Sequence, residues 1–130
     1  DTVMKELCSK SKPFSLSIKD IGIFNGRESI RVLWLGLGGD VKELGLLHKQ
    51  TDETLSTLRF IPEKRSFKPH VTIGQDIVFE CGFDQIRDAI GQLHYNSITV
   101  SSLFLFKSEQ IGNKRVYTKV SQYDLYKKHY

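Results

Sequence analysis

A histidine and a threonine two positions apart are the residues of this 130-residue chain that best suit acid–base chemistry. His70 and Thr72 belong to the stretch His70-Val71-Thr72-Ile73, whose polar–apolar alternation predicts a strand. Residues i and i+2 of a strand point to the same face, so the imidazole and the hydroxyl would lie together. Pro69 immediately before them predicts an extended entry into this strand.

Such a pair can move a proton and bind an anion. An imidazole titrates near neutrality, so His70 can accept or donate a proton at working pH. The hydroxyl of Thr72 can hold the ring or donate a hydrogen bond to an anionic oxygen. Lys68 adds a positive charge that suits a phosphate. The same spacing also fits two polar residues on the solvent-facing side of an ordinary strand, since H-x-T often occurs by chance.

The pattern around this pair predicts an α+β domain with a mostly antiparallel sheet. Apolar residues recur at helical spacing up to residue 10, from 41 to about 59, and from 83 to 94. Strands are predicted at residues 14–24, 30–38, 70–75, 97–106 and 114–120, with a loop at 107–113. Asp40 suits the N-cap of the second helix. Trp34 lies in a strand that is apolar on both faces, so we expect it in the core.

The order of these elements contains a repeat. The second half, about 61–130, has the order strand, helix, strand, strand, and the first half, about 1–60, has the order helix, strand, strand. When SLSI at 15–18 is aligned with SITV at 97–100, the first half lacks the strand that should precede its helix. That strand would lie roughly a dozen residues before Asp1. We therefore expect one domain over 1–130 with two pseudo-symmetric halves, the first truncated at its N-terminus.

Composition and charge do not identify a binding partner. The chain is 39% hydrophobic and 26% charged, and no apolar run approaches the roughly 18 residues of a membrane span. A net charge of +4 permits a polyanionic partner without requiring one. Cys8 and Cys81 match no metal-ligand spacing, and free thiols in a reducing cytosol are the expected state, with a single disulfide left open. We expect a cytoplasmic monomer with no membrane partner.

A longer passage resembles a known family. RVLWLGLGGDVKELGLLHKQTDETLSTLRFIPEKRSFKPHVTIGQ is similar in order and spacing to a passage of the two-histidine phosphoesterase superfamily. There a VLW-hydrophobic-G strand and a helix precede an F-[RK]-P-H-hydrophobic-[TS]-hydrophobic strand. The ending ITVSSLFLFKSEQIGNKRVYTKV resembles the family's closing hairpin. The superfamily includes 2′-5′ RNA ligases and RNA 2′,3′-cyclic phosphodiesterases, and the resemblance covers the chain from Phe14 onward.

The resemblance implies a bilobal fold, in which two pseudo-symmetric halves surround a central cleft and each supplies one H-x-[TS] strand. One histidine would act as general base and the other as general acid on the leaving ribose oxygen, while the hydroxyls bind the phosphate. His70 and Thr72 match the second motif and would be catalytic, and Lys68 matches a commonly basic position that would bind substrate. The implied substrate is an RNA end or small nucleotide with a 2′,3′-cyclic phosphate, and neither a metal nor another cofactor is needed.

The chain departs from this family in having one such motif. The other histidines, His48, His94 and His129, are expected at the surface or at helix ends, and Gly74-Gln75 stand where the family often has an arginine. Either the first motif lies upstream of Asp1, or the protein is catalytically inactive. In the first case the parent protein would be an enzyme. In both cases the 130 residues alone would be inactive. The alternatives are a non-catalytic nucleotide- or RNA-binding module of the same fold, or an interaction domain without a ligand.

Overall fold

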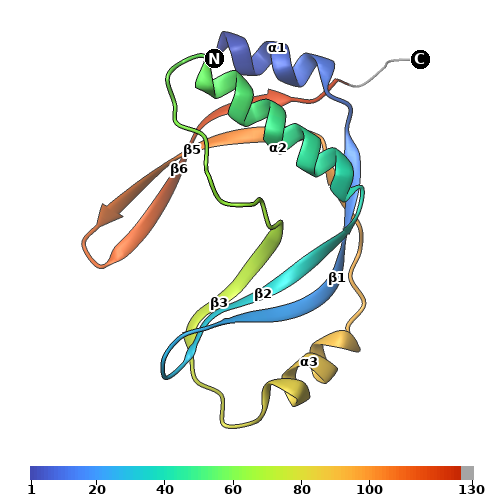
Figure 1. Cartoon of the computed structure of the whole chain (residues 1–130), viewed down its shortest axis with the longest axis vertical. Coiled ribbons are helices and arrows are strands. Elements are labelled where there is room, and N and C mark those ends of the chain that lie inside the picture. Colours follow the sequence, from blue (N-terminus) through green and yellow to red (C-terminus); the bar gives the residue numbers. More distant parts are fainter. Residues whose placement is uncertain (127–130) are drawn as a thin grey trace. The chain divides into compact units, whose positions relative to one another are not determined.

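The computed structural model describes residues 1–126, and within them the chain forms three helices and six strands (Figure 1). In chain order these are α1 (Thr2–Lys10), β1 (Phe14–Asn25), β2 (Ile30–Gly39), α2 (Val41–Ser56), β3 (His70–Ile77), α3 (Phe83–Gly91), β4 (Ile98–Val100), β5 (Ser102–Ile111) and β6 (Lys114–Asp124). The pairings of β1 with β2, β2 with β3, and β5 with β6 are antiparallel. The predicted α+β class with mostly antiparallel sheet is confirmed.

Two helices end earlier than predicted. α2 ends at Ser56 rather than near Arg59, because the N–H groups of Leu58 and Arg59 bond to carbonyls three residues back and Arg59 has a φ of 68°. This left-handed residue stops the helix. α3 ends at Gly91, so the segment up to His94 is not helical.

The predicted loop at 107–113 is wrong, because most of it is strand. β5 continues to Ile111 and β6 begins at Lys114, which leaves Gly112 and Asn113 as a two-residue turn. Gly112 has a φ of 58°, a conformation that such hairpin turns require. The polar residues 107–110 hid this strand, since exposed strands need no apolar alternation. The strand predicted at 97–106 is also divided, with a break at Ser101 between β4 and β5.

The described chain divides into two compact units. The first unit contains residues 1–14, 42–65 and the segment from 99 onward, and the second contains residues 15–41 and 66–98. Each unit therefore combines segments from both halves of the sequence. The candidate pair His70 and Thr72 belongs to the second unit.

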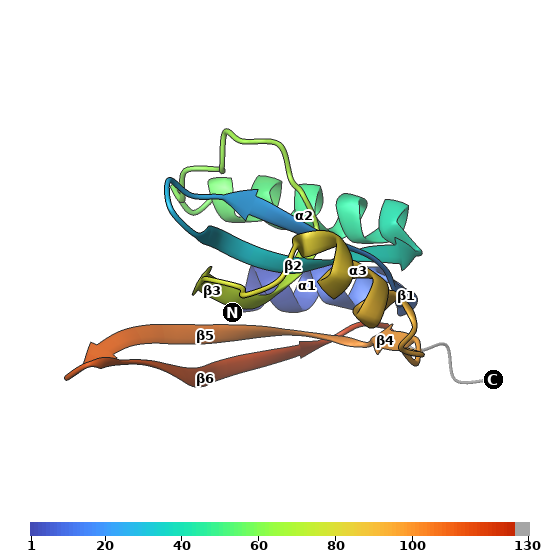
Figure 2. The same ribbon diagram turned by 90° about the horizontal axis from the view of Figure 1, so that it is seen from below.

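The first unit packs α1 against β6. The hydroxyl of Tyr123 donates to the Asp1 carboxylate at 2.5 Å. The N–H of Tyr126 lies 2.8 Å from the Ser11 carbonyl oxygen and 3.1 Å from that of Cys8. β5 and β6 form a long two-stranded ribbon (Figure 2). The buried side chains of this unit are Cys8, Phe14, Leu47, Tyr123 and Leu125.

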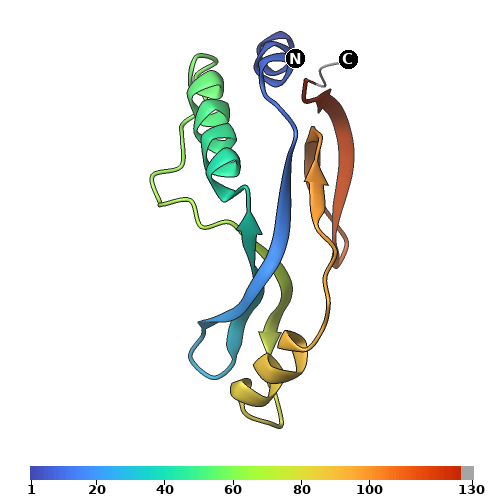
Figure 3. The same ribbon diagram turned by 90° about the vertical axis from the view of Figure 1, so that its right-hand side faces the viewer.

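The second unit holds β3, β2 and β1 side by side in that order, with β4 next to β1 at its boundary. Figure 3 shows the ribbon of β1 beside that of β2. The Asp40 carboxylate accepts a hydrogen bond from the Ser15 backbone N–H at 2.8 Å, and the Asp40 N–H donates to the Ser15 carbonyl at 2.9 Å. This exchange fastens the end of β2 to the start of β1. Leu16 and Leu33 are buried.

Two further predictions concern the cysteines and the chain end. Cys8 is a buried free thiol and Cys81 an exposed one. None of the helices among residues 1–126 combines the length and the apolar character that crossing a bilayer demands. His129 lies outside the described residues.

Candidate functional site

The structure places His70 and Thr72 on one face of β3. Antiparallel pairing with β2 sets Gly36 opposite His70 and Trp34 opposite Thr72. Both members of the pair are exposed. The strand predicted from the alternation around His70 is confirmed. The side chains of His70 and Thr72 lie on the same face of the sheet as the side chain of Trp34.

Two aromatic rings surround the imidazole of His70. The ring of Phe24 meets it edge to face, with centroids 5.6 Å apart and an interplanar angle of 90°. The ring of Trp34 lies 6.3 Å away at 60°, and the centroids of Phe24 and Trp34 are 5.6 Å apart. His70 therefore stands beside an aromatic surface that continues from β3 onto β2 and β1.

Gly22 makes room for this surface. It pairs with Trp34, and a Cβ added to Gly22 would lie 2.1 Å from the indole Cζ2. The indole therefore lies directly over the Gly22 backbone. Trp34, which was expected in the core, is half-buried, and its side chain lies on the face of His70. Sequence reasoning missed Phe24 and Trp34 as neighbours of the site, because the pairing of β1, β2 and β3 brings them to His70 and no single stretch of sequence specifies that pairing.

The ring orientation of His70 is set by a backbone contact. Its Nδ1 lies 2.6 Å from the carbonyl oxygen of Lys68. A carbonyl can only accept, so Nδ1 carries the proton that is donated. In the neutral imidazole this leaves Nε2 with the lone pair, so Nε2 is the atom that takes up or gives back a proton. The sequence grouped Lys68 with His70 for its charge, whereas the contact that the structure gives is made by its backbone.

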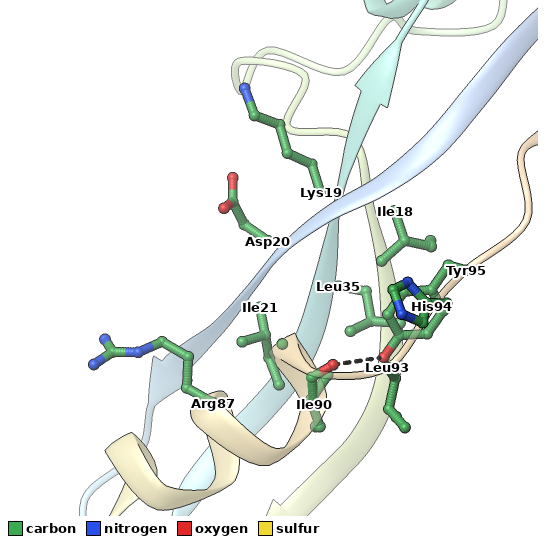
Figure 4. Close-up of a pocket in the computed structure, with 11 residues that line it drawn as sticks. Ile18, Lys19, Asp20, Ile21, Leu35, Arg87, Ile90, Leu93, His94 and Tyr95 are labelled. Carbon is green, nitrogen blue, oxygen red and sulfur yellow. Dashed lines mark hydrogen bonds between the residues drawn. The ribbon is translucent and has the colours of Figure 1, made fainter.

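The other described histidines lie elsewhere. His48 belongs to α2 in the first unit, where its Nε2 is 4.0 Å from the Asp52 carboxylate. His94 follows α3 in the second unit and lines a pocket of about 310 Å³ (Figure 4). The pocket lies between α3 and the β1–β2 pair, and its side chains include Ile18, Ile21, Leu35, Ile90, Leu93 and Tyr95.

This pocket is on the opposite side of the sheet from His70. Leu35, which lines it, pairs with Val71, the residue between His70 and Thr72. Successive strand residues point to opposite faces, so Val71 lies on the same face of the sheet as Leu35, while His70 and Thr72 lie on the other face. Lys19, Asp20, Arg87 and His94 also line the pocket, as Figure 4 shows, so its lining is part aliphatic and part polar. Among residues 1–126 no cluster of three or more His, Cys, Asp or Glu side chains is arranged to hold a metal ion.

Comparison with known proteins places the chain in a family. A family model described as the 2′-5′ RNA ligase superfamily matches residues 1–111. The chain is 28% identical over 128 residues to the RNA 2′,3′-cyclic phosphodiesterase of Methanothermobacter thermautotrophicus, an alignment that covers 96% of this chain and 68% of the relative. It is 29% identical over 115 residues to the protein of the same name from Methanocaldococcus jannaschii, which covers 86% of this chain and 64% of the relative.

The fold agrees with this match. The structure resembles the crystal structure of E. coli LigT complexed with 3′-AMP, with a TM-score of 0.70, 22% sequence identity, and coverage of 95% of this chain and 67% of LigT. The chain thus spans about two thirds of the length of each of these three relatives. Because the family model matches most of the sequence and the fold is shared, this chain belongs to the 2′-5′ RNA ligase superfamily.

Proposed function

We propose that this chain is the part of an RNA 2′,3′-cyclic phosphodiesterase that supplies His70 and Thr72 to the active site. The observation that carries the proposal is the hydrogen bond from His70 Nδ1 to the Lys68 carbonyl at 2.6 Å. It leaves Nε2 of an exposed imidazole to exchange protons, beside a hydroxyl on the same strand face. The superfamily match and the two archaeal relatives support the reaction class.

The reaction opens a cyclic phosphate at an RNA end or on a small nucleotide. Water attacks phosphorus as the bond to one ribose oxygen breaks, a base takes the proton from the water, and an acid gives a proton to the leaving oxygen. His70 serves as one of these two groups through Nε2. The Thr72 hydroxyl donates a hydrogen bond to a non-bridging oxygen, and Lys68 contributes positive charge. A 5′-hydroxyl of RNA in place of water would give 2′-5′ joining.

His70 needs a second proton-transfer group. Within the second unit, His94 cannot serve, because it lines the pocket on the other side of the sheet. We propose that a second H-x-[TS] strand encoded before Asp1 supplies this group, in keeping with the greater length of the relatives. Loss of one group from an acid–base pair lowers the rate by about 10²–10⁴-fold. The 130 residues alone should therefore be nearly inactive.

A non-catalytic nucleotide- or RNA-binding module is the second candidate. It is favoured by the same observation that the second unit, as described, brings His70 together with no other histidine. Such a module would keep the Thr72 hydroxyl and the aromatic surface for binding, without turnover. A cytoplasmic location is also a proposal, supported by the free thiols of Cys8 and Cys81, which suit a reducing compartment. A monomeric state stays a proposal.

The deciding experiment uses the longest open reading frame that contains this chain. It is assayed for hydrolysis of a 2′,3′-cyclic nucleotide as wild type, His70→Ala and the control His94→Ala. The proposal expects turnover in wild type and in the control, and its loss in His70→Ala with unchanged folding by circular dichroism. Equal turnover in His70→Ala rules out the assigned role. A wild type without turnover, but with NMR shifts at His70 and Thr72 on adding a 2′-phosphonucleotide, supports the binding module.

A further inference from the structure

The β5–β6 hairpin has two chemically different faces. Its register pairs Phe104 with Gln122, Phe106 with Lys119, Ser108 with Tyr117, and Gln110 with Arg115. Residues directly opposite one another in an antiparallel pair lie on the same face. This face, called here the aromatic face, therefore consists of Phe104, Phe106, Ser108, Gln110, Arg115, Tyr117, Lys119 and Gln122. The aliphatic residues that are paired in the hairpin, Leu103, Leu105, Ile111 and Val116, fall on the other face.

The other face is the one that turns toward α1. Tyr123 pairs with Leu103 on that face, is only 5% exposed, and donates its hydroxyl to Asp1 at the start of α1. The salt bridge between Lys107 and Glu109, at 2.7 Å, also lies there. The aromatic face therefore points away from the helix that packs on this hairpin within the first unit.

The aromatic side chains of the aromatic face are exposed to solvent. Phe104 is 47% exposed, Phe106 51% and Tyr117 66%. The rings of Phe104 and Phe106 have centroids 6.2 Å apart, and the ammonium group of Lys119 lies 5.3 Å from the centroid of Phe104. Rings of this size are normally buried when they serve packing alone. Their exposure in a row, with a cation over one of them, suggests a flat π-bearing partner.

Charge identifies the kind of partner. The aromatic face carries two exposed cations, Arg115 and Lys119, and none of its eight positions as defined by the register holds a carboxylate. Aromatic rings interleaved with cations are the arrangement by which proteins bind single-stranded nucleic acid, because bases stack on the rings while cations meet the phosphates.

We propose that the aromatic face of the β5–β6 hairpin binds the unpaired nucleotides of an RNA strand, with bases stacked on Phe104 and Phe106 and phosphates near Lys119 and Arg115. The inference rests on the proposed function and sharpens its substrate class. The preferred substrate is an RNA end with several unpaired nucleotides rather than a mononucleotide. Stacking is tolerant of sequence, so the surface selects single strands and not a particular sequence.

The test measures binding without chemistry. A fluorescently labelled, mixed-sequence single-stranded RNA of about a dozen nucleotides, a length that spans a typical site of this kind, ends in a 3′-hydroxyl and is titrated with the 130-residue chain. Fluorescence anisotropy gives the affinity at several salt concentrations. The double variant Phe104→Leu/Phe106→Leu keeps apolar bulk but removes the rings, and Lys119→Ala removes one cation. Matched controls on the other face are Ile111→Ala and Lys114→Ala, with circular dichroism melts to verify folding.

The leucine variant should weaken RNA binding about tenfold. Lys119→Ala should lower the slope of log affinity against log salt by about one, and the controls should bind like wild type. Unchanged affinity in a folded leucine variant overturns the inference. A chain that dimerises through this face, shown by light scattering and abolished by the leucine variant, also overturns it.

The same titration separates this inference from the proposed function. Binding of the 3′-hydroxyl RNA by the 130-residue chain and turnover of the cyclic nucleotide by the longest reading frame are scored separately. If the Phe104→Leu/Phe106→Leu variant binds RNA like wild type while the longest reading frame turns over the cyclic nucleotide, RNA binding by the aromatic face is excluded and the phosphodiesterase proposal stands. If the Phe104→Leu/Phe106→Leu variant weakens RNA binding but the longest reading frame shows no turnover, RNA binding by the aromatic face is supported and the phosphodiesterase proposal fails.

Discussion

The Nδ1 atom of His70 lies 2.6 Å from the backbone carbonyl oxygen of Lys68, two residues earlier in the chain. Pro69 stands between them, and its ring fixes its own φ and favours an extended conformation of Lys68. The proline thus restricts the backbone that presents the carbonyl to the imidazole. The contact fixes the proton on Nδ1 and leaves Nε2 as the exchanging atom.

The first prediction concerns the tautomer of His70. Because a carbonyl accepts only, the neutral ring should be the Nδ1–H form. Nitrogen-15 NMR of the imidazole, recorded at a pH where the ring is neutral, distinguishes the two tautomers directly. His94, which has no such contact with the carbonyl of Lys68, serves as the internal comparison. Observation of the Nε2–H form at His70 would contradict the geometry on which the mechanism rests.

The second prediction concerns the hydroxyl of Thr72. Thr72→Val keeps the shape of the side chain and removes the donor that the mechanism places on the phosphate. In the longest reading frame, kcat should fall about 10²-fold, the usual loss when one donor to a developing charge is removed. Thr118→Val, on the far face of the hairpin from the aromatic residues, is the matched control and should leave kcat unchanged. A variant at Thr72 with full activity would remove this residue from the site.

The third prediction concerns the packing of Trp34 on Gly22. A methyl group at Gly22 would collide with the indole, because the added Cβ would lie 2.1 Å from Cζ2. Gly22→Ala should therefore lower the free energy of unfolding by about 1–3 kcal/mol, as overpacking generally does. Gly45→Ala is the matched control, since nothing lies within 4 Å of its added Cβ in α2.

Urea denaturation of both glycine variants measures this difference. Gly45→Ala should raise the free energy of unfolding by about 0.5–1 kcal/mol, because alanine is the better helix former. The prediction also gives a local readout, since a displaced indole in Gly22→Ala should change the tryptophan fluorescence. Equal stability of Gly22→Ala and wild type would show that Trp34 does not rest on this glycine.

The fourth prediction concerns the two thiols. Cys8 is 1% exposed, and burial raises the pKa of its thiol, with a smaller contribution from the charge of Asp124. A raised pKa means less of the reactive thiolate at any given pH below it. Cys81 is exposed, so iodoacetamide at neutral pH should alkylate Cys81 first, and Cys8 only after denaturation. Peptide mass spectrometry identifies the modified thiol, and rapid labelling of Cys8 in the folded chain would contradict its burial.

The sequence determined those features that depend on neighbours along the chain. Strand alternation put His70 and Thr72 on one face, and helical spacing located α1, α2 and α3, because these periods arise from local backbone geometry. Helix ends were less accurate, since termination after Ser56 depends on the left-handed conformation of Arg59, which no apolar spacing encodes. The polar stretch before Gly112 was misread as a loop for a related reason, because its strand is exposed and lacks an apolar pattern.

Contacts between residues that are distant in the sequence depend on the tertiary structure. The register of β1, β2 and β3 puts Trp34 opposite both Gly22 and Thr72, and so moves it from an expected core position to the face of His70. The register of β5 and β6 likewise separates aromatic and cationic residues from aliphatic ones. Cross-strand register depends on turns, bulges and the packing of whole elements, none of which a single stretch of sequence specifies. The chemistry of His70 was therefore visible in the sequence, while its aromatic surroundings were determined by the fold.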